Sequence, residues 1–207
     1  HEIKIPIATS KMIVENNKNE ITESINEELD KIDNYTEQAL FYARSNTVEK
    51  DYIVRKIQLK EIVNASILKN KAQLIQNKIS IDTKNLDETV CTDSKWCIFI
   101  INQIIQNSIK YSKNADRQIE IYGERKKESI ILHIKDNGIG IKESEITRVF
   151  EKGFTGSDRS KSNSTGVGLY LARKLSFRLG LKLDIASEEK EYTILQITFP
   201  KGTVHRI

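Results

Sequence analysis

Apolar residues recur at alternating steps of four and three along the first 45 residues of the chain. Two rows follow this spacing: Ile3, Ile7, Ser10 and Val14, and then Ile25, Leu29, Ile32, Thr36, Ala39 and Ala43. The polar run 15–20 separates the two rows. The spacing predicts two amphipathic helices joined by a short turn within residues 1–45. Because so narrow a hairpin buries little surface by itself, we expect a homodimer in which two copies form a four-helix bundle.

Helical and strand-like patterns alternate in the rest of the chain. Regular spacing is lost over residues 46–56, which we interpret as a linker, and a second domain is expected over residues 57–207. The patterns predict helices at 61–76, 94–112 and 167–179, and strands at 79–82, 89–92, 118–122, 129–135, 181–187 and 192–199. A charged hairpin is expected at 123–128 and a loop-rich segment at 136–165. This order predicts an α+β sandwich, in which helices cover one face of a mixed sheet.

Composition excludes several classes of protein. The chain has 207 residues, with 33 Lys and Arg mixed among 29 Asp and Glu and a net charge of +4, which argues against a dedicated nucleic-acid-binding protein. Cys91 and Cys97 are spaced as neither a metal site nor a redox pair, which fits a reducing, cytosolic setting. No apolar run approaches the roughly 18 residues of a membrane span, and the start at His1 indicates a piece of a longer protein.

A glycine-containing segment, Asp136-Asn-Gly138-Ile-Gly140, directly follows the strand expected at 129–135. A carboxylate at the end of a strand can accept a hydrogen bond from an exocyclic amine, such as that of adenine. The two glycines would let the backbone pass close to a ligand. Taken by itself, the segment is more typical of an ordinary Asn-Gly turn.

A second glycine segment, Thr165-Gly166-Val-Gly168-Leu169, opens the helix expected at 167–179. The free N–H groups and the dipole at the start of a helix favour a phosphate group. The segment lacks the Gly-Lys-Ser/Thr of a P-loop, and no strand leads into it as in a dinucleotide-binding fold. A tight entry turn into the helix is the alternative interpretation.

The helix expected at 94–112 carries a stripe of polar residues. Gln103, Asn107, Lys110 and Tyr111 lie at i, i+4, i+7 and i+8 and therefore on one side of the helix. An amide, an ammonium group and an aromatic ring suit a metal ion, a phosphate and a base. The alternative is an amphipathic helix whose polar residues meet at its edge. Since isoleucines surround Asn107 in the sequence, we expect its side chain to have a partner.

Together these segments resemble the motifs of the sensor histidine kinases of two-component systems, whose ATP-binding fold is shared with gyrase, Hsp90 and MutL. The matching motifs are the phosphoacceptor box at 1–6, the N box at 103–111, the first glycine box at 136–140, the F box at Phe150 and Phe154, and the second glycine box at 165–169. Residues 41–52 further resemble the intramembrane-sensing kinases that respond to bacitracin-like peptide antibiotics. The resemblance implies an α/β sandwich ATP-binding domain after a helical hairpin whose first helix begins at its reactive residue.

The resemblance implies that Nε2 of His1 attacks the terminal phosphorus of ATP, while Glu2 accepts the Nδ1 proton. The phosphoryl group would then pass to an aspartate of a response regulator. The chain would be the cytoplasmic portion of a bacterial membrane protein and would act as a homodimer. For the full-length protein, an antibiotic-transporting ABC transporter is a further expected partner, whereas nucleic acid is not expected.

The resemblance assigns ATP and Mg²⁺ to a site made of Asn107, Lys110, Tyr111, Asp136, Gly138, Gly140, Phe150, Phe154, Thr165, Gly166, Gly168 and Leu169. Asn107 would ligate Mg²⁺, and Lys110 would meet the phosphates. Tyr111 would pack by the adenine, whose amino group would bind Asp136. Phe150 and Phe154 would anchor a lid formed by residues 142–165.

Two positions depart from the pattern that the resemblance implies. Gln103 stands where water-cleaving relatives of this fold have a glutamate that acts as a base, so we expect slow ATP hydrolysis. Ile5 stands where kinases that also dephosphorylate their partner usually have Thr or Asn, which puts phosphatase activity in doubt. The alternatives to a kinase are a nucleotide-binding signalling scaffold without catalysis and a conformational ATPase.

Overall fold

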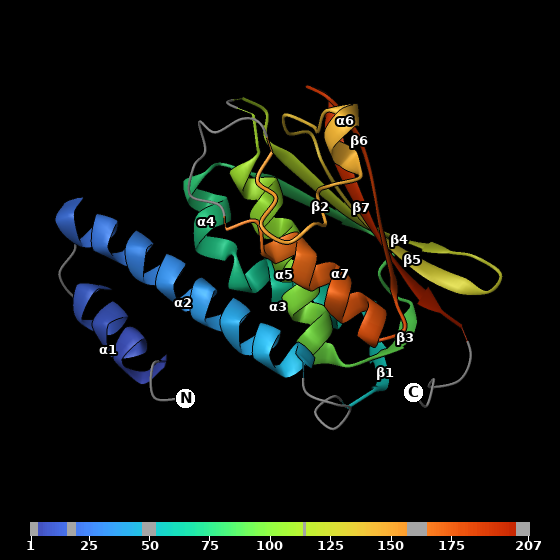
Figure 1. The fold of residues 1–207 in the computed structure, drawn as a ribbon, viewed down its shortest axis with the longest axis horizontal. Coiled ribbons are helices and arrows are strands. Elements are labelled where there is room, and N and C mark those ends of the chain that lie inside the picture. The colour runs from blue at the N-terminus through green and yellow to red at the C-terminus, as the bar shows by residue number, and fades with distance from the viewer. Residues whose placement is uncertain (1–3, 16–19, 47–52, 114, 157–164, 202–207) are drawn as a thin grey trace. The chain divides into compact units, whose positions relative to one another are not determined.

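The computed structural model describes residues 4–15, 20–46, 53–113, 115–156 and 165–201 of the chain (Figure 1). The chain divides into two compact units, residues 1–48 and residues 49–207. Each unit is considered by itself below, because their relative placement is not determined.

The first unit contains the two helices that the apolar spacing predicts. They are α1 (Lys4–Glu15) and α2 (Glu20–Asn46), and they pack against each other. Lys11 on α1 lies 2.7 Å from Asp30 and 3.6 Å from Asp33 on α2, so ion pairs link the two helices. Ile7 and Phe41 are buried, whereas several other apolar side chains of both helices remain exposed. The hairpin therefore leaves apolar surface uncovered within its own unit.

The second unit holds two sheets. Its elements are β1 (Arg55–Gln58), α3 (Leu59–Lys69), α4 (Lys71–Gln76), β2 (Ser80–Lys84), β3 (Thr89–Thr92), α5 (Ser94–Lys110), β4 (Gln118–Arg125), β5 (Ser129–Asp136), α6 (Glu143–Ile146), α7 (Gly168–Arg178), β6 (Lys182–Glu188) and β7 (Tyr192–Pro200). Strands β1 and β3 form an antiparallel pair, and the larger sheet has the order β2-β4-β5-β7-β6. Only the β2–β4 pairing in this larger sheet is parallel, so the described sheet is mixed, as predicted.

Helices α3, α5 and α7 cover one face of the larger sheet (Figure 1). The central helix, α5, packs against α3, α7 and β5, and four of its isoleucines, Ile100, Ile101, Ile104 and Ile105, are fully buried. Asp93 caps this helix by accepting a hydrogen bond from the Trp96 backbone N–H at 3.0 Å. A helix enclosed on three sides must be apolar over most of its circumference. This enclosure restricts the directions in which the polar residues of α5 can point.

Several element boundaries differ from the predicted ones. The helix expected at 61–76 is two helices, and they meet at Asn70, whose Nδ2 donates to Asn102 Oδ1 at 2.7 Å. Strand β4 continues through Gly123, where a Cβ would lie 2.2 Å from the Asn85 carbonyl oxygen, so this glycine permits close packing rather than a turn. The first half of strand β1 falls in the predicted linker, and the strand was not predicted because only its pairing with β3 reveals it.

Candidate functional site

A cavity of about 660 Å³ lies at one end of the larger sheet. Five segments that are distant in the sequence line it: Asn107, Ser108 and Tyr111; Asp136 and 139–142; Glu145, Val149 and 154–156; Gly166 and Leu169; and Ile185, Glu189, Lys190, Thr193 and Leu195. The wall combines aliphatic side chains with polar and charged ones; the aliphatic side chains are Ile139, Ile141, Val149, Leu169, Ile185 and Leu195. A concave site with apolar and polar side chains is typical of a binding site for a small organic molecule.

Asp136 is the buried carboxylate of this cavity. It ends strand β5 and is only 6% exposed. Ser108 Oγ donates to its Oδ2 at 2.7 Å, and the Gly138 backbone N–H donates to its Oδ1 at 3.0 Å. Burial raises the pKa of Asp136, while the hydrogen bonds from Ser108 and Gly138 oppose that rise. Each carboxylate oxygen keeps a further lone pair, so the group can still accept a hydrogen bond from a ligand.

The loop after Asp136 is held between the end of α5 and the β6–β7 turn. The Ile139 N–H donates to the Tyr111 carbonyl at 3.0 Å, and the Lys190 N–H donates to the Ile139 carbonyl at 2.7 Å. Gly140 has a φ of +65°, and a Cβ there would lie 2.0 Å from the Glu188 carbonyl oxygen. The glycine at this position is therefore required both by backbone conformation and by space.

We expect Gly140→Ala to destabilise this domain more than Gly153→Ala does. Both glycines have positive φ, so both variants carry the left-handed strain of roughly 1–2 kcal/mol. A Cβ at Gly153 meets nothing within 4 Å, whereas one at Gly140 meets backbone. The clash should add about 1–3 kcal/mol to the loss of unfolding free energy. Chemical denaturation of the two variants measures the difference, and equal losses would contradict the packing argument.

The polar stripe predicted on α5 divides in the structure. Asn107 and Tyr111 line the cavity, whereas Gln103 and Lys110 are not among its described lining residues. Gln103 is buried at 2% exposure, and its Nε2 lies 3.4 Å from Gln106 Oε1. The Lys110 ammonium lies 5.7 Å from the centre of the Tyr111 ring. The structure thus brings the amide and the aromatic ring of the stripe to the cavity.

Two contacts between an arginine and an aromatic ring, and one backbone hydrogen bond, hold the described parts of the segment expected to act as a lid. Phe154 lines the cavity, and the Arg148 guanidinium lies 4.6 Å from its ring centre. Phe150 is buried, with the Arg173 guanidinium of α7 at 4.8 Å from its ring centre. The Gly153 N–H donates to the Gly166 carbonyl at 2.9 Å, which closes the base of the segment.

The remaining predicted site residues fall into three groups. Gly140, Gly166 and Leu169 line the cavity. Gly138, Phe150 and Thr165 lie in the loops around the cavity, and Gly168 begins α7, but none of them is among the described lining residues. His1 and Glu2 lie outside the residues that the structure describes, so their predicted roles stay predictions.

Ser108 and Thr193 are among the polar residues of the cavity that sequence reasoning missed. Ser108 follows Asn107 directly, and Thr193 is the cross-strand partner of Asp136 on β7. The stripe analysis counted residues at helical spacing from Gln103, which passes over Ser108. The pairing of β5 with β7 that identifies Thr193 has no local sequence signal.

A known protein family matches the part of the chain that forms the cavity. The family described as "Histidine kinase-, DNA gyrase B-, and HSP90-like ATPase" matches residues 92–203, which is just over half of the chain. The chain belongs to this family. All five segments of the cavity fall inside the matched region, so the match supports ATP as the ligand of this ATPase-like domain.

A curated relative extends the similarity to nearly the whole chain. "Sensor protein kinase GraS" of Staphylococcus aureus strain N315 is 33% identical over 204 residues, which is 97% of this chain and 58% of that protein. The resemblance to sensor histidine kinases is therefore confirmed. The chain spans somewhat more than half the length of this relative.

Solved structures agree on the fold of this ATPase family member. Full-length ShkA in complex with AMPPNP matches 99% of this chain and 45% of its own, with a TM-score of 0.72 and 15% identity. ThkA in complex with response regulator protein TrrA matches 97% and 60%, with a TM-score of 0.67 and 16% identity. AdeS of Acinetobacter baumannii matches 98% of both chains, with a TM-score of 0.60 and 18% identity. The predicted α+β class is confirmed.

Proposed function

We propose that this chain is the kinase core of a two-component sensor: it transfers the terminal phosphoryl group of ATP to His1 and then to an aspartate of a response regulator. The observation that carries the proposal is the buried carboxylate of Asp136 at the cavity, beside aliphatic walls that suit a purine ring. The similar protein GraS is named a sensor protein kinase, and ThkA is titled as a complex with a response regulator protein.

The proposed nucleotide site assigns a separate task to each part of the cavity. Asp136 accepts a hydrogen bond from the adenine amino group, while Ile139 and Leu169 contact the ring faces. Gly166, just before α7, and Gly168, its first residue, would donate backbone N–H groups to the phosphates. Lys110, although not lining the cavity, is one helical turn from Asn107 and is the proposed phosphate contact on α5.

Mg²⁺ is a second proposed component of the site. No group of three or more His, Cys, Asp or Glu side chains that could hold a metal occurs among the described residues. Mg²⁺ commonly binds through substrate phosphates and water with one or two protein ligands, so this sparse donor set fits it. Asn107, whose amide lines the cavity, is the proposed protein ligand. The ion would neutralise charge on the phosphate oxygens.

Transfer to histidine requires a neutral imidazole with a free lone pair. An unperturbed histidine has a pKa near 6.5, so at pH 7 most His1 side chains are neutral. Nε2 of His1 would form a bond to the γ-phosphorus as the bond to the β,γ-bridging oxygen breaks, leaving ADP. Glu2 would stabilise the positive charge that develops on the ring. Positioning and charge neutralisation are the main contributions that a protein makes to such a transfer.

A labelling experiment tests the proposal. The chain is incubated with Mg²⁺ and ATP labelled at the γ-phosphate, and the protein is then exposed to acid or to alkali. Label that acid removes and alkali leaves is expected for phosphohistidine. Nucleotide binding without any label would favour a non-catalytic scaffold. Steady release of phosphate would favour a conformational ATPase, against which the amide of Gln103 argues because it cannot accept a proton from water.

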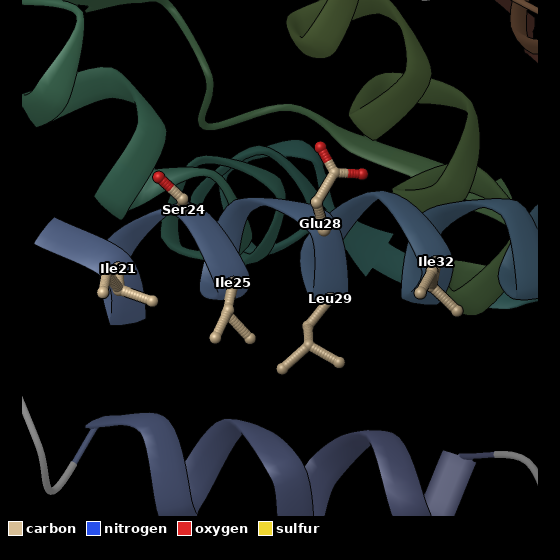
Figure 2. Close-up of a pocket in the computed structure, with 6 residues that line it drawn as sticks. All are labelled: Ile21, Ser24, Ile25, Glu28, Leu29 and Ile32. Carbon is tan, nitrogen blue, oxygen red and sulfur yellow. The ribbon is translucent and has the colours of Figure 1, made fainter.

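The first unit supports pairing of two copies as part of this proposal. A groove on α2 is lined by Ile21, Ser24, Ile25, Glu28, Leu29 and Ile32 (Figure 2). Figure 2 draws the four aliphatic side chains on one side of the helix, with Ser24 and Glu28 on the other. Ile21 is 72% exposed and Ile32 is 46% exposed. A second copy would cover this surface and complete a four-helix bundle.

Ile25→Glu is expected to raise the dissociation constant of such a dimer at least about a hundredfold. Each symmetric interface would contain the substitution twice, and each copy would bury an unpaired carboxylate. Leu68→Glu adds the same charge at an aliphatic position of the second unit that is 69% exposed and does not line the groove, and it should have little effect. Analytical ultracentrifugation of the two variants gives the comparison. Similar dissociation constants would argue against this face as the interface.

The location of the complete protein in the cell, and the signals that act on it, are also proposals. In the described residues, the structure contains no helix with the length and hydropathy of a membrane span. We propose that the complete protein is a bacterial membrane sensor, that its kinase part faces the cytoplasm, and that peptide antibiotics and an ABC transporter act upstream. The resemblance of residues 41–52 to intramembrane-sensing kinases supports this subgroup. Ile5 leaves phosphatase activity in doubt, as its side chain cannot orient an attacking water.

A further inference from the structure

Asp93, the residue before α5, accepts a hydrogen bond at each of its two carboxylate oxygens. Its Oδ1 accepts from the Trp96 backbone N–H at 3.0 Å, and this bond caps the helix. Its Oδ2 accepts from the Ile53 backbone N–H at 2.6 Å. Asp93 is only 6% exposed. One buried carboxylate therefore joins the first turn of α5 to a segment that lies 40 residues earlier in the chain.

The second hydrogen bond holds the chain where it enters the second unit. Ile53 is the first residue of that unit that the structure describes. Its side chain is 77% exposed, so burial of the side chain contributes little to holding it in place. Arg55 begins β1 two residues later, and its guanidinium donates to Ser94 Oγ at 3.3 Å. The entering chain is thus bound to the N-terminal end of α5.

Helix α5 connects this end of the domain with the cavity. It has 17 residues, which corresponds to a length of about 25 Å, and Asn107 in its last turn lines the cavity. Helices α3 and α7 and strand β5 pack against α5 and hold it in place. A segment that is bound to the first turn of α5 consequently has a defined position relative to the proposed nucleotide site.

Capping of α5 does not require the second oxygen of Asp93. A cap uses one side-chain oxygen, and serine is about as effective as aspartate in this role. The bond to Ile53 is charge-assisted, and such bonds are stronger than those between neutral groups. A carboxylate at position 93 therefore holds Ile53 in addition to capping the helix, which a hydroxyl group there would not do.

We propose that the hydrogen bond between Ile53 and Asp93 sets the length of the segment between the two units, and through that length the rate at which His1 meets ATP. While the bond is formed, the segment that follows α2 ends at Ile53. When the bond is broken, the segment extends to β1, and each released residue adds up to about 3.5 Å to its reach. A longer segment lowers the effective concentration of bound ATP at His1. The inference rests on the proposed function, because it concerns transfer to His1.

Two substitutions remove this hydrogen bond from opposite sides. Asp93→Ser keeps a hydroxyl group that can cap α5 but provides no second acceptor for Ile53. Ile53→Pro removes the donor, since proline has no N–H, and leaves the carboxylate of Asp93 in place. Asp87→Ser is the matched control, because it makes the same chemical change at an exposed residue of the same unit.

Amide hydrogen exchange, followed by NMR on the 207-residue chain, tests for the bond itself. The Ile53 N–H should exchange about tenfold faster in Asp93→Ser than in the wild type, because it loses a charge-assisted acceptor. Asp87→Ser should leave this exchange rate unchanged. An Ile53 N–H that exchanges equally fast in Asp93→Ser and in the wild type would refute the inference.

The rate of labelling from γ-labelled ATP, at saturating nucleotide, tests the consequence for transfer. Asp93→Ser and Ile53→Pro should each lower this rate about twofold, while the affinity for ADP stays unchanged. The double variant should be no slower than either single variant, because both substitutions remove the same bond. If Ile53 exchanges faster but labelling keeps its wild-type rate, the bond is purely structural and the inference is wrong.

Two further outcomes keep this inference separate from the proposed function. A wild-type chain that takes up no label refutes the proposed function, whereas a labelled wild type with unchanged rates in both variants refutes only the control by Asp93. If Asp93→Ser does not fold, Ile53→Pro decides, because it leaves the helix cap intact. An unchanged labelling rate in Ile53→Pro would then overturn the inference.

Discussion

His1→Gln is expected to reduce labelling of the protein from γ-labelled ATP to background. The amide nitrogen of glutamine has no available lone pair, because that pair is delocalised into the carbonyl group, so it cannot attack phosphorus. Nucleotide affinity should be unchanged, since every described lining residue of the cavity lies between Asn107 and Leu195. Autoradiography after gel separation measures the label, and calorimetry with ADP measures the affinity.

The other two histidines provide the control for this variant. His133 lies in strand β5 at 6% exposure and stacks on Tyr122 with ring centres 4.5 Å apart. Its Nε2 lies 3.1 Å from Glu124 Oε2, so the ring is engaged within the sheet. His205→Gln should keep full labelling. Acid-labile label that persists in His1→Gln would place the acceptor at another residue and would overturn the proposed role of His1.

Helices and strands whose apolar residues recur with a clear period could be predicted from the sequence. Elements that form only by contact with a distant segment could not. Helix α5 and strands β5 and β7 match their predicted positions within two residues, because buried isoleucines mark their cores. Strand β1 has the burial pattern of an exposed segment and forms only because β3 lies beside it. The break between α3 and α4 depends on Asn70 reaching Asn102 on another helix. Such contacts between distant segments carry no local signal.

The residues of the candidate site divide in the same way into those that could be predicted from the sequence and those that could not. Asp136 and the glycines after it could be predicted, because a strand end followed by Gly-x-Gly restricts what the backbone can do. The place of Asn107 and Tyr111 at the cavity follows from helical spacing. That spacing also grouped Lys110 with them, although in the structure its ammonium lies by the Tyr111 ring rather than among the lining residues. Ser108 and Thr193 depend on how α5 and β7 face Asp136, which only the folded structure reveals.

Asp136→Ala is expected to weaken ADP binding about ten- to a hundredfold. A hydrogen bond to a charged group contributes roughly 1.5–3 kcal/mol, and here the acceptor is a buried carboxylate. The substitution also leaves the Ser108 hydroxyl and the Gly138 N–H without their acceptor. Calorimetry on wild-type and variant chains gives the ratio of affinities. An unchanged affinity would show that the adenine does not bind at this carboxylate and would refute the assignment of the cavity.

Asp136→Asn tests the role of the charge in ligand binding separately from its role in the stability of the fold. The amide of asparagine can still form hydrogen bonds with Gly138 and Ser108, but it carries no charge. Burial raises the pKa of Asp136 above the ordinary value of 3.8, so the folded chain holds this proton more tightly than the unfolded chain does. The stabilisation from protonated Asp136 is therefore complete below pH 3.8 and is lost as the pH rises through the raised pKa. At pH 7 the unliganded Asn variant should melt at a temperature equal to or above that of the wild type, and any advantage should vanish in acid. If this variant is as stable as the wild type but binds ADP weakly, the ionised carboxylate of Asp136 is needed for the ligand. The same ionised carboxylate then lowers the stability of the domain when no ligand is bound.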